Sequence, residues 1–307
     1  MRYISAILHS AVLISTPLLF AATGGMFTEL AGMMNIALEG MLLAGAFAAI
    51  AAVSMTGSIS AGICAAIIAA SVLALLTALS VLKLKSNVFI AGLAANLLAG
   101  GLTIVLSQRI FNTRGVVPLR ELIALPVINI PLVEKIPLAG TLLSGHSLYT
   151  YTAWLFLVIA WLAIYKTPFG YRLRAGGTSP KILRSLGIDN SKYCYAAFLI
   201  SGFCCGIGGS FLSLNLGAFI PNMSAGRGWI ALIIMLLARR RPLGILIAAL
   251  VYGLAEALSN YAQGAIKIPA ELILAMPYLI TLLAICGSSI FTSYRSRAGK
   301  ALLPAKH

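Results

Sequence analysis

Long apolar runs, separated by short polar or glycine-rich breaks, dominate the pattern of this 307-residue chain. A helix needs roughly 20 residues to cross the hydrocarbon core of a bilayer. Runs of about this length predict transmembrane helices at residues 4–22, 33–55, 59–82, 87–107, 148–165, 194–217, 242–261 and 271–291. We therefore expect an all-α fold: a polytopic integral membrane helical bundle of about 8–10 helices, with broken or re-entrant segments and one domain over residues 1–307.

Three segments depart from this regular pattern. The apolar piece at 228–238 is too short to cross as an ordinary helix, so it is either half of a re-entrant hairpin or a short tilted helix inside the protein. Glycines within 24–32 interrupt the first two runs, which predicts a broken helix or re-entrant turn and leaves the side of residue 1 open. Segment 108–147 is rich in proline, which disfavours helix, and reads either as an external lid-like loop or as a floppy connector.

Composition excludes a soluble domain, because 60% of the residues are hydrophobic, only 9% are charged and mean hydropathy is +1.00. The net charge of +15 comes from Lys and Arg between the apolar runs, which argues against nucleic-acid binding and for membrane orientation. Basic clusters at 83–85, 166–192, 239–241 and 295–306 predict one cytoplasmic side that includes the C-terminus.

Enzymatic chemistry finds no support in the sequence. The chain lacks a Walker phosphate-binding loop, its five cysteines have no companion histidines, and its three histidines are scattered. We expect a non-catalytic protein with no catalytic residues, no cofactor and no metal site.

The basic loop at 166–192 carries the signals of a short helix. Ser179 suits the cap, Pro180 the first helical position and Gly187 the C-terminal stop. Residues Ile182, Leu183 and Leu186 form an apolar stripe. From physical chemistry alone, this stripe fits either the membrane surface or a protein partner.

Polar residues inside apolar runs form the second signal. Glu39 and Glu256 have long apolar surroundings, where an acid is costly, and the spacing of Asn35 from Glu39 predicts one shared helix face. Asn96, within a run of small residues, needs a partner or a cavity. These residues either line a polar pathway or include a buried glutamate bonded to a broken helix end.

Five blocks of the sequence together carry a family resemblance: Thr28–Phe47, Asn87–Gly100, Lys166–Gly187, Pro221–Ile230 and Arg241–Glu256. They resemble the branched permeases of bacterial ABC importers, specifically the nucleoside and simple-sugar group. The unusual turn at 176–178 and the three arginines at 239–241 depart from the pattern of that family, and both concern the docking face.

The resemblance implies an ATP-driven importer of alternating-access type in the bacterial cytoplasmic (inner) membrane. Its partners would be an ABC ATPase subunit, a second homologous permease forming a heterodimer, an extracytoplasmic substrate-binding protein and membrane lipid. The expected cargo is a purine nucleoside or a nucleoside-like solute such as riboflavin. A simple-sugar permease is the alternative, and an ion-coupled secondary transporter is less favoured because no acidic cluster occurs.

The resemblance and the polar pattern together assign site residues. Coupling to the ATPase is assigned to Gly170, Arg172, Gly176, Pro180, Ile182, Leu183, Leu186 and Gly187. The translocation pathway or subunit interface is assigned to Asn35, Glu39, Asn96 and Glu256. Contact with the binding protein is assigned to Asn222 and Arg227.

Overall fold

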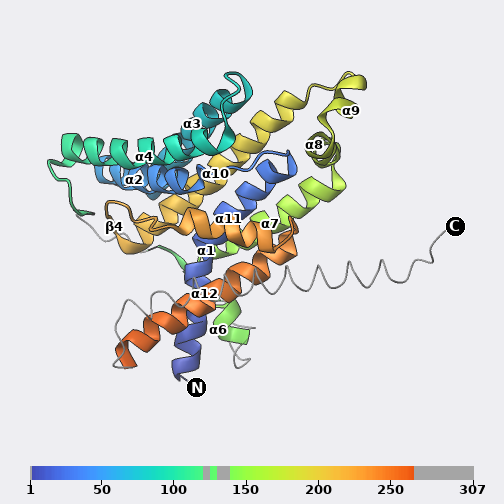
Figure 1. Ribbon diagram of the computed structural model, residues 1–307. Helices are drawn as coiled ribbons and strands as arrows, with labels where there is room; N and C mark the ends of the chain where they lie inside the picture. Colours follow the sequence, from blue (N-terminus) through green and yellow to red (C-terminus); the bar gives the residue numbers. More distant parts are fainter. Residues whose placement is uncertain (1, 120–124, 130–138, 266–307) are drawn as a thin grey trace.

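The computed structural model of the chain describes residues 2–119, 125–129 and 139–265 (Figure 1). Within these residues, 7 helices are long and apolar enough to cross a membrane. They are α1 (Arg2–Leu30), α2 (Leu38–Thr56), α3 (Ile59–Leu82), α4 (Val88–Phe111), α7 (Leu148–Lys166), α10 (Asn190–Leu216) and α12 (Pro242–Ala265). The predicted all-α, multi-pass membrane fold is confirmed, while the predicted run at 271–291 lies outside the described residues.

Shorter elements connect these helices. They are α6 (Ala139–Leu143), α8 (Pro168–Thr178), α9 (Pro180–Ser185) and α11 (Arg227–Leu237). Strand β1 (Val117–Pro118) pairs antiparallel with β4 (Ala218–Phe219), and β2 (Val127–Ile128) pairs antiparallel with β3 (His146–Ser147). The described parts of segment 108–147 thus contain short ordered pieces: β1 pairs with the distant strand β4, whereas β2 and β3 pair with each other inside the segment.

Helix α10 is the centre of the bundle, packed against α1, α2 and α3. Its glycines allow this close approach: a Cβ added to Gly206 would lie 2.6 Å from the Cα of Ile67, and one added to Gly202 would lie 2.7 Å from the Cβ of Ala74. Helices in a membrane associate through such close van der Waals packing, because lipid gives apolar side chains no hydrophobic reason to leave it.

The expected break within residues 24–32 is displaced in the structure. Helix α1 continues to Leu30, and the chain leaves helical geometry only over residues 31–37. Gly24 serves close packing, because a Cβ there would lie 2.9 Å from the Cα of Ser201 on α10. The prediction read all the glycines of this segment as helix breakers; Gly32, at φ 81°, does lie in the break, whereas the helix tolerates Gly24 for the contact that it permits.

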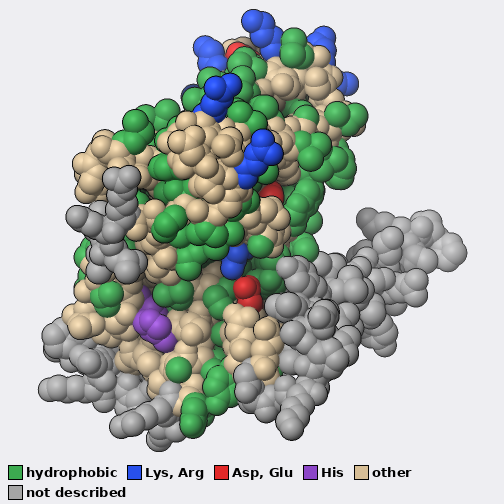
Figure 2. Space-filling view, turned by 90° about the vertical axis from the view of Figure 1, so that its left-hand side faces the viewer, with side chains coloured by type: hydrophobic (Ala, Val, Ile, Leu, Met, Phe, Trp, Pro, Cys, Tyr) green, Lys and Arg blue, Asp and Glu red, His purple; other side chains and the backbone are tan. Residues whose placement is uncertain are grey.

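Three of the four basic clusters lie at one end of the bundle. Leu82, which precedes the cluster at 83–85, lines a cavity of about 500 Å³ together with Arg184 and Gly187 from the cluster at 166–192. Arg240, from the cluster at 239–241, reaches Glu29 at the same end of α1. Helices α8 and α9 mark this end at the upper right of Figure 1, and Figure 2 shows Lys and Arg gathered there. The cluster at 295–306 lies outside the described residues.

A histidine pair joins α1 to strand β3 and helix α6, away from the basic end. The rings of His9 and His146 stack with their centroids 4.5 Å apart. The Nε2 of His146 lies 3.2 Å and 3.1 Å from the carbonyl oxygens of Thr141 and Leu142, so this nitrogen carries the proton. Burial, and then the neighbouring His9, lowers the pKa of His146, which keeps its ring neutral.

Candidate functional site

Two helices begin inside the bundle instead of at its surface. Helix α2 starts at Leu38, and α11 starts at Arg227. Ile36, just before α2, packs closely against Gly92 of α4. The two starts touch, because a Cβ on Gly228 would collide with the backbone of Glu39. We call the polar residues around these starts the half-helix junction: Asn35, Glu39, Asn96, Arg227 and Glu256.

Two asparagines satisfy the backbone groups at the start of α2. The first turn of any helix has N–H groups without partners in the helix. Asn96 on α4 accepts a hydrogen bond from the Gly40 N–H at 2.8 Å and donates one to the Ile36 carbonyl at 2.9 Å. Asn35 accepts from the Ala37 N–H at 3.1 Å and donates to Ser201 Oγ at 2.8 Å. Both amides therefore anchor the break between α1 and α2.

This geometry corrects the prediction that Asn35 and Glu39 share one helix face. Asn35 lies in the non-helical segment before α2, while Glu39 lies in the first turn of that helix. An asparagine that bonds the backbone two residues ahead favours a turn over a helix, and the spacing rule applies only within a helix.

Glu39 holds the start of α11. Its Oε1 accepts from the Gly226 N–H at 2.8 Å, and its Oε2 accepts from the Gly228 N–H at 2.6 Å. A carboxylate at a helix N-terminus satisfies unpaired donors and faces the positive end of the helix dipole. The sequence left two interpretations open, a polar pathway or a glutamate bonded to a broken helix end. The hydrogen bonds of Glu39 match the second. The residue as a whole is half-buried.

Arg227, the first residue of α11, forms an ion pair with α12. Arg227 Nη2 lies 3.6 Å from Glu256 Oε1 on α12, and Arg227 Nη1 donates to the Met223 carbonyl at 3.2 Å. The guanidinium is thus engaged within the junction by a carboxylate and a backbone carbonyl. Asn222 is exposed, in a left-handed turn at φ 59°. Contact of these two residues with a binding protein stays a prediction.

The junction offers polar recognition without reactive chemistry. It joins two helix starts, two carboxylates, one guanidinium and two amides. Charged residues among membrane-spanning helices typically face the interior or a cavity and mark a transport path. Among residues 2–119, 125–129 and 139–265, no group of three His, Cys, Asp or Glu could hold a metal ion.

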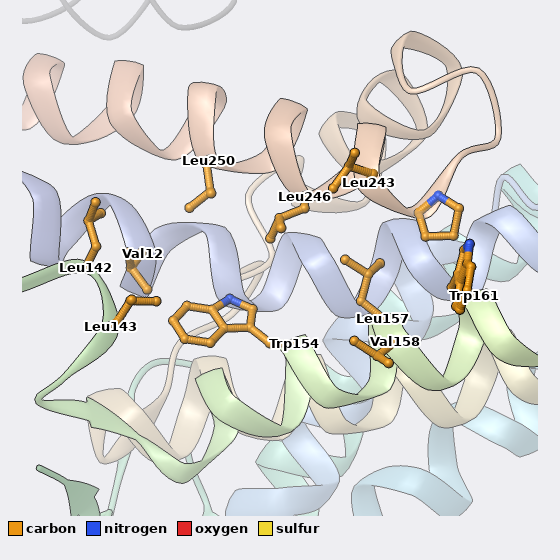
Figure 3. Close-up of a pocket in the computed structure, with 11 residues that line it drawn as sticks. Val12, Leu142, Leu143, Trp154, Leu157, Val158, Trp161, Leu243, Leu246 and Leu250 are labelled. Carbon is orange, nitrogen blue, oxygen red and sulfur yellow. The ribbon is translucent and has the colours of Figure 1, made fainter. Parts of the chain in front are cut away.

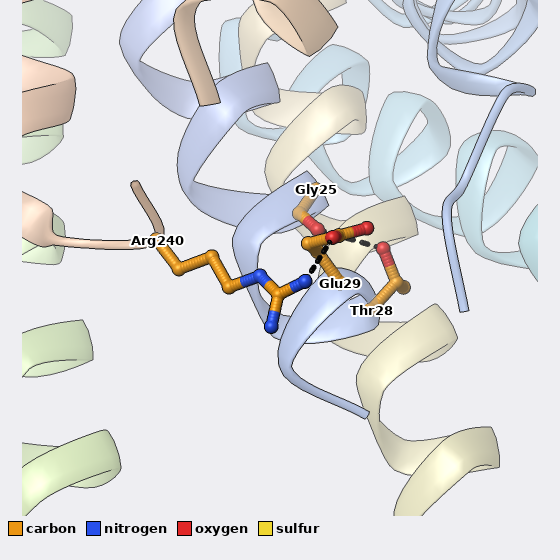
Figure 4. A network of polar contacts seen from close by, with 4 residues as sticks. All are labelled: Gly25, Thr28, Glu29 and Arg240. Carbon is orange, nitrogen blue, oxygen red and sulfur yellow. Dashed lines mark hydrogen bonds and ion pairs between the residues drawn. The ribbon is translucent and has the colours of Figure 1, made fainter. Parts of the chain in front are cut away.

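A second ion pair lies nearer the basic end and was not singled out from the sequence. Arg240, in the turn between α11 and α12, donates to Glu29 Oε1 at 2.7 Å (Figure 4). In the same helix turn, Thr28 Oγ1 donates to the Gly25 carbonyl at 2.7 Å. Glu29 is largely buried, with 11% of its side chain exposed. The far end of α11 is therefore tied to the last turn of α1.

The expected coupling loop consists of two helices instead of one. Helix α9 occupies the predicted position, and α8 precedes it over residues that the sequence analysis read as loop. A side chain at Gly170 would collide with backbone carbonyls of α7, and one at Gly176 would collide with Asn190. Glycine is therefore the residue that fits at both positions. Backbone atoms of Gly177 in α8 lie directly against the backbone of Gly32 in the break after α1, with no room for a side chain between them.

The remaining coupling residues divide into buried and exposed. Leu183 is buried, whereas Leu186 is 69% exposed and Arg172 donates from its own exposed side chain to Tyr193 Oη at 3.0 Å. Pro180 begins α9, and Gly187 ends the turn after it at φ 72°, as expected for a glycine stop. The side chain of Ile182 lies outside the described set. Of the two stripe residues whose side chains are described, Leu186 is the exposed one.

Comparison with known proteins finds one family and several relatives. A model of the family described as branched-chain amino acid transport system / permease component matches residues 7–285. The nucleoside ABC transporter permease protein NupC of Lactococcus lactis is 30% identical over 290 residues, covering 91% of this chain and 90% of the relative. The guanosine ABC transporter permease protein NupQ of Bacillus subtilis is 30% identical, covering 93% and 92%.

A relative named for a different cargo is similar to the same degree. The putative glucose ABC transporter permease protein TsgC13 of Haloferax volcanii is 31% identical over 268 residues, covering 86% of this chain and 79% of the relative. No solved structure matches the chain.

Proposed function

Since this chain belongs to the family of branched-chain amino acid transport system permease components, we propose that it is the membrane subunit of an ATP-driven importer for a purine nucleoside or a nucleoside-like solute. Near full-length similarity to two permeases named for nucleosides carries this proposal. Riboflavin, with its ribityl chain, stays within the proposed cargo class. The glucose-named relative supports a simple sugar as the second candidate.

The half-helix junction supplies the polar part of the proposed pathway. A nucleoside is uncharged and rich in hydroxyl and ring nitrogen groups, so it needs hydrogen-bond partners while water is excluded. Glu39, Arg227 and Glu256 have donors and acceptors beside accessible space. We place them, with Asn35 and Asn96 as supports, along an alternating-access route at or near the interface with a second, non-identical permease subunit.

Uptake by the reconstituted complex tests the function. We expect proteoliposomes with the permease pair, its ATPase and its binding protein to accumulate guanosine or adenosine when ATP is enclosed in the vesicle lumen, on the same side as the ATPase. Accumulation should fall to the passive level with a non-hydrolysable nucleotide. Riboflavin and glucose, each offered separately and as competitors, identify the cargo within the proposed classes. ATP-independent uptake driven by an ion gradient would contradict the importer assignment.

The α8–α9 pair is the proposed ATPase contact. Leu186→Asp places a charge where the exposed leucine would enter an apolar groove of a partner, so we expect loss of ATPase co-purification and a fall in uptake of about tenfold or more, the effect of roughly 1.4 kcal/mol. Because Leu186 is exposed, the bundle should still fold.

Leu84→Asp is the matched control, since Leu84 is also an exposed leucine at the basic end, 73% accessible, but lies between α3 and α4. Equal loss of ATPase binding in both variants would contradict a specific role for α9. Insertion of each variant is checked by membrane yield and gel filtration.

A further inference from the structure

An apolar groove of about 730 Å³ lies between α7 and α12, with α1 behind it (Figure 3). Trp154, Leu157, Val158 and Trp161 line it from α7, and the side chains facing them come from α12. Figure 3 shows Leu142, Leu143 and Val12 at one end and Trp161 with Leu243 toward the other. Among the described residues, no charged side chain lines the groove.

Several of the side chains that line the groove are exposed. Both of its walls are helices long and apolar enough to cross the membrane. Val158, Trp161 and Leu243 line it while remaining 54%, 44% and 69% exposed, respectively. An elongated apolar surface at this place is complementary to a hydrocarbon chain.

One end of the groove is basic. The Lys166 Nζ lies 6.0 Å from the centroid of the Trp161 ring, and Arg241 directly precedes Pro242, another lining residue. The Lys166 and Arg241 side chains are exposed. Tryptophan and basic residues at the end of a transmembrane helix mark the headgroup level, with positive charge on the cytoplasmic side.

We propose that this groove binds one anionic phospholipid of the cytoplasmic leaflet. Its acyl chain lies between α7 and α12, and its phosphate lies between Lys166 and Arg241. Charge complementarity selects an anionic headgroup over a zwitterionic one, since each Lys or Arg near the surface favours anionic lipid. The site is separate from the half-helix junction and does not depend on which solute is carried.

The tryptophans of the chain provide the probe. Of its 3 tryptophans, Trp154 and Trp161 line the groove, whereas Trp229 lies on α11. The full-length Trp229→Phe variant is reconstituted in phosphatidylcholine nanodiscs. Increasing mole fractions of phosphatidylglycerol or phosphatidylcholine, brominated on the acyl chains, are then added, and quenching of tryptophan fluorescence reports occupancy of the groove.

We expect half-maximal quenching at a lower mole fraction of the brominated phosphatidylglycerol than of the brominated phosphatidylcholine. Adding Lys166→Gln or Arg241→Gln should weaken this preference by about fivefold for each side chain. Lys83→Gln and Lys85→Gln are the matched single controls, because each removes one charge from an exposed residue at the same end but away from the groove.

Three results would overturn the proposal. One is equal quenching by the two lipids, and another is a preference that survives loss of Lys166 and Arg241. The third is quenching by neither lipid, which would show that protein fills the groove. In that case, a disulfide between cysteines placed at Leu246 and within the apolar run at 271–291 would identify the occupant as this chain itself.

Discussion

Replacing Glu39 with alanine should abolish uptake, because it removes the acceptor of two hydrogen bonds at the start of α11. The Gly226 and Gly228 N–H groups would be left without their carboxylate partner inside the bundle. Hydrogen bonds to charged groups contribute about 1.5–3 kcal/mol each, so for the two bonds we expect destabilisation of about 3–6 kcal/mol. Thermal unfolding in detergent and uptake in proteoliposomes measure the two effects.

A graded series separates the cap from a general need for polarity. Glu39→Gln keeps one acceptor oxygen but loses the charge, so its loss of stability and uptake should be intermediate. Glu39→Asp keeps the charge on a shorter side chain and should retain at most one of the two bonds. Wild-type stability and uptake in the alanine variant would refute the role of Glu39 as the anchor of α11.

Gly177→Ala should uncouple ATP hydrolysis from uptake. A Cβ at this position would collide with the carbonyl oxygen of Leu30 and lie 2.8 Å from the Gly32 nitrogen. Backbone atoms cannot rotate away as a side chain can, so α8 must move off the break after α1. We expect uptake to fall at least about tenfold, corresponding to roughly 1.4 kcal/mol, while ATP hydrolysis by the assembled complex continues.

Gly101→Ala is the matched control for this substitution. It adds the same methyl group inside helix α4, where no heavy atom lies within 4 Å of the added Cβ. Alanine in place of glycine stabilises such a site by about 0.4–1 kcal/mol, so uptake should be unchanged. Normal coupled uptake by Gly177→Ala would show that the contact of α8 with α1 does not transmit ATPase motion.

The long helices could be predicted from the sequence because length and hydropathy alone define a span. The run at 59–82 coincides with α3, and the short run at 228–238 falls within one residue of α11. The sequence placed the start of the break after α1 too early. A glycine such as Gly24 looks the same in the sequence whether it ends a helix or packs against Ser201. Helix α8 was missed, since glycines at 176 and 177 lower helix propensity and their tertiary contacts are invisible in sequence.

The candidate site was predictable as a set of residues but not as an arrangement. Asn35, Glu39, Asn96 and Glu256 stand out because polar groups are costly in a membrane. Their partners do not, since the Glu39 bonds go to backbone N–H groups 187 and 189 residues away. The ion pair of Glu29 and Arg240 was only weakly indicated by the sequence. The indications were an acidic residue at the end of an apolar run and a cluster of three arginines that would be stabilised by a nearby carboxylate.

The length of α11 makes it a short lever. With 11 residues it is about 16 Å long, so a tilt of about 10° about its Glu39-held start moves its other end by about 3 Å. The 2.7 Å contact between Arg240 and Glu29 lies just beyond that moving end, so the same tilt would have to be followed by the flexible Arg240 side chain. Glu39 therefore holds the end of α11 that moves least, and Arg240 follows the end that moves furthest.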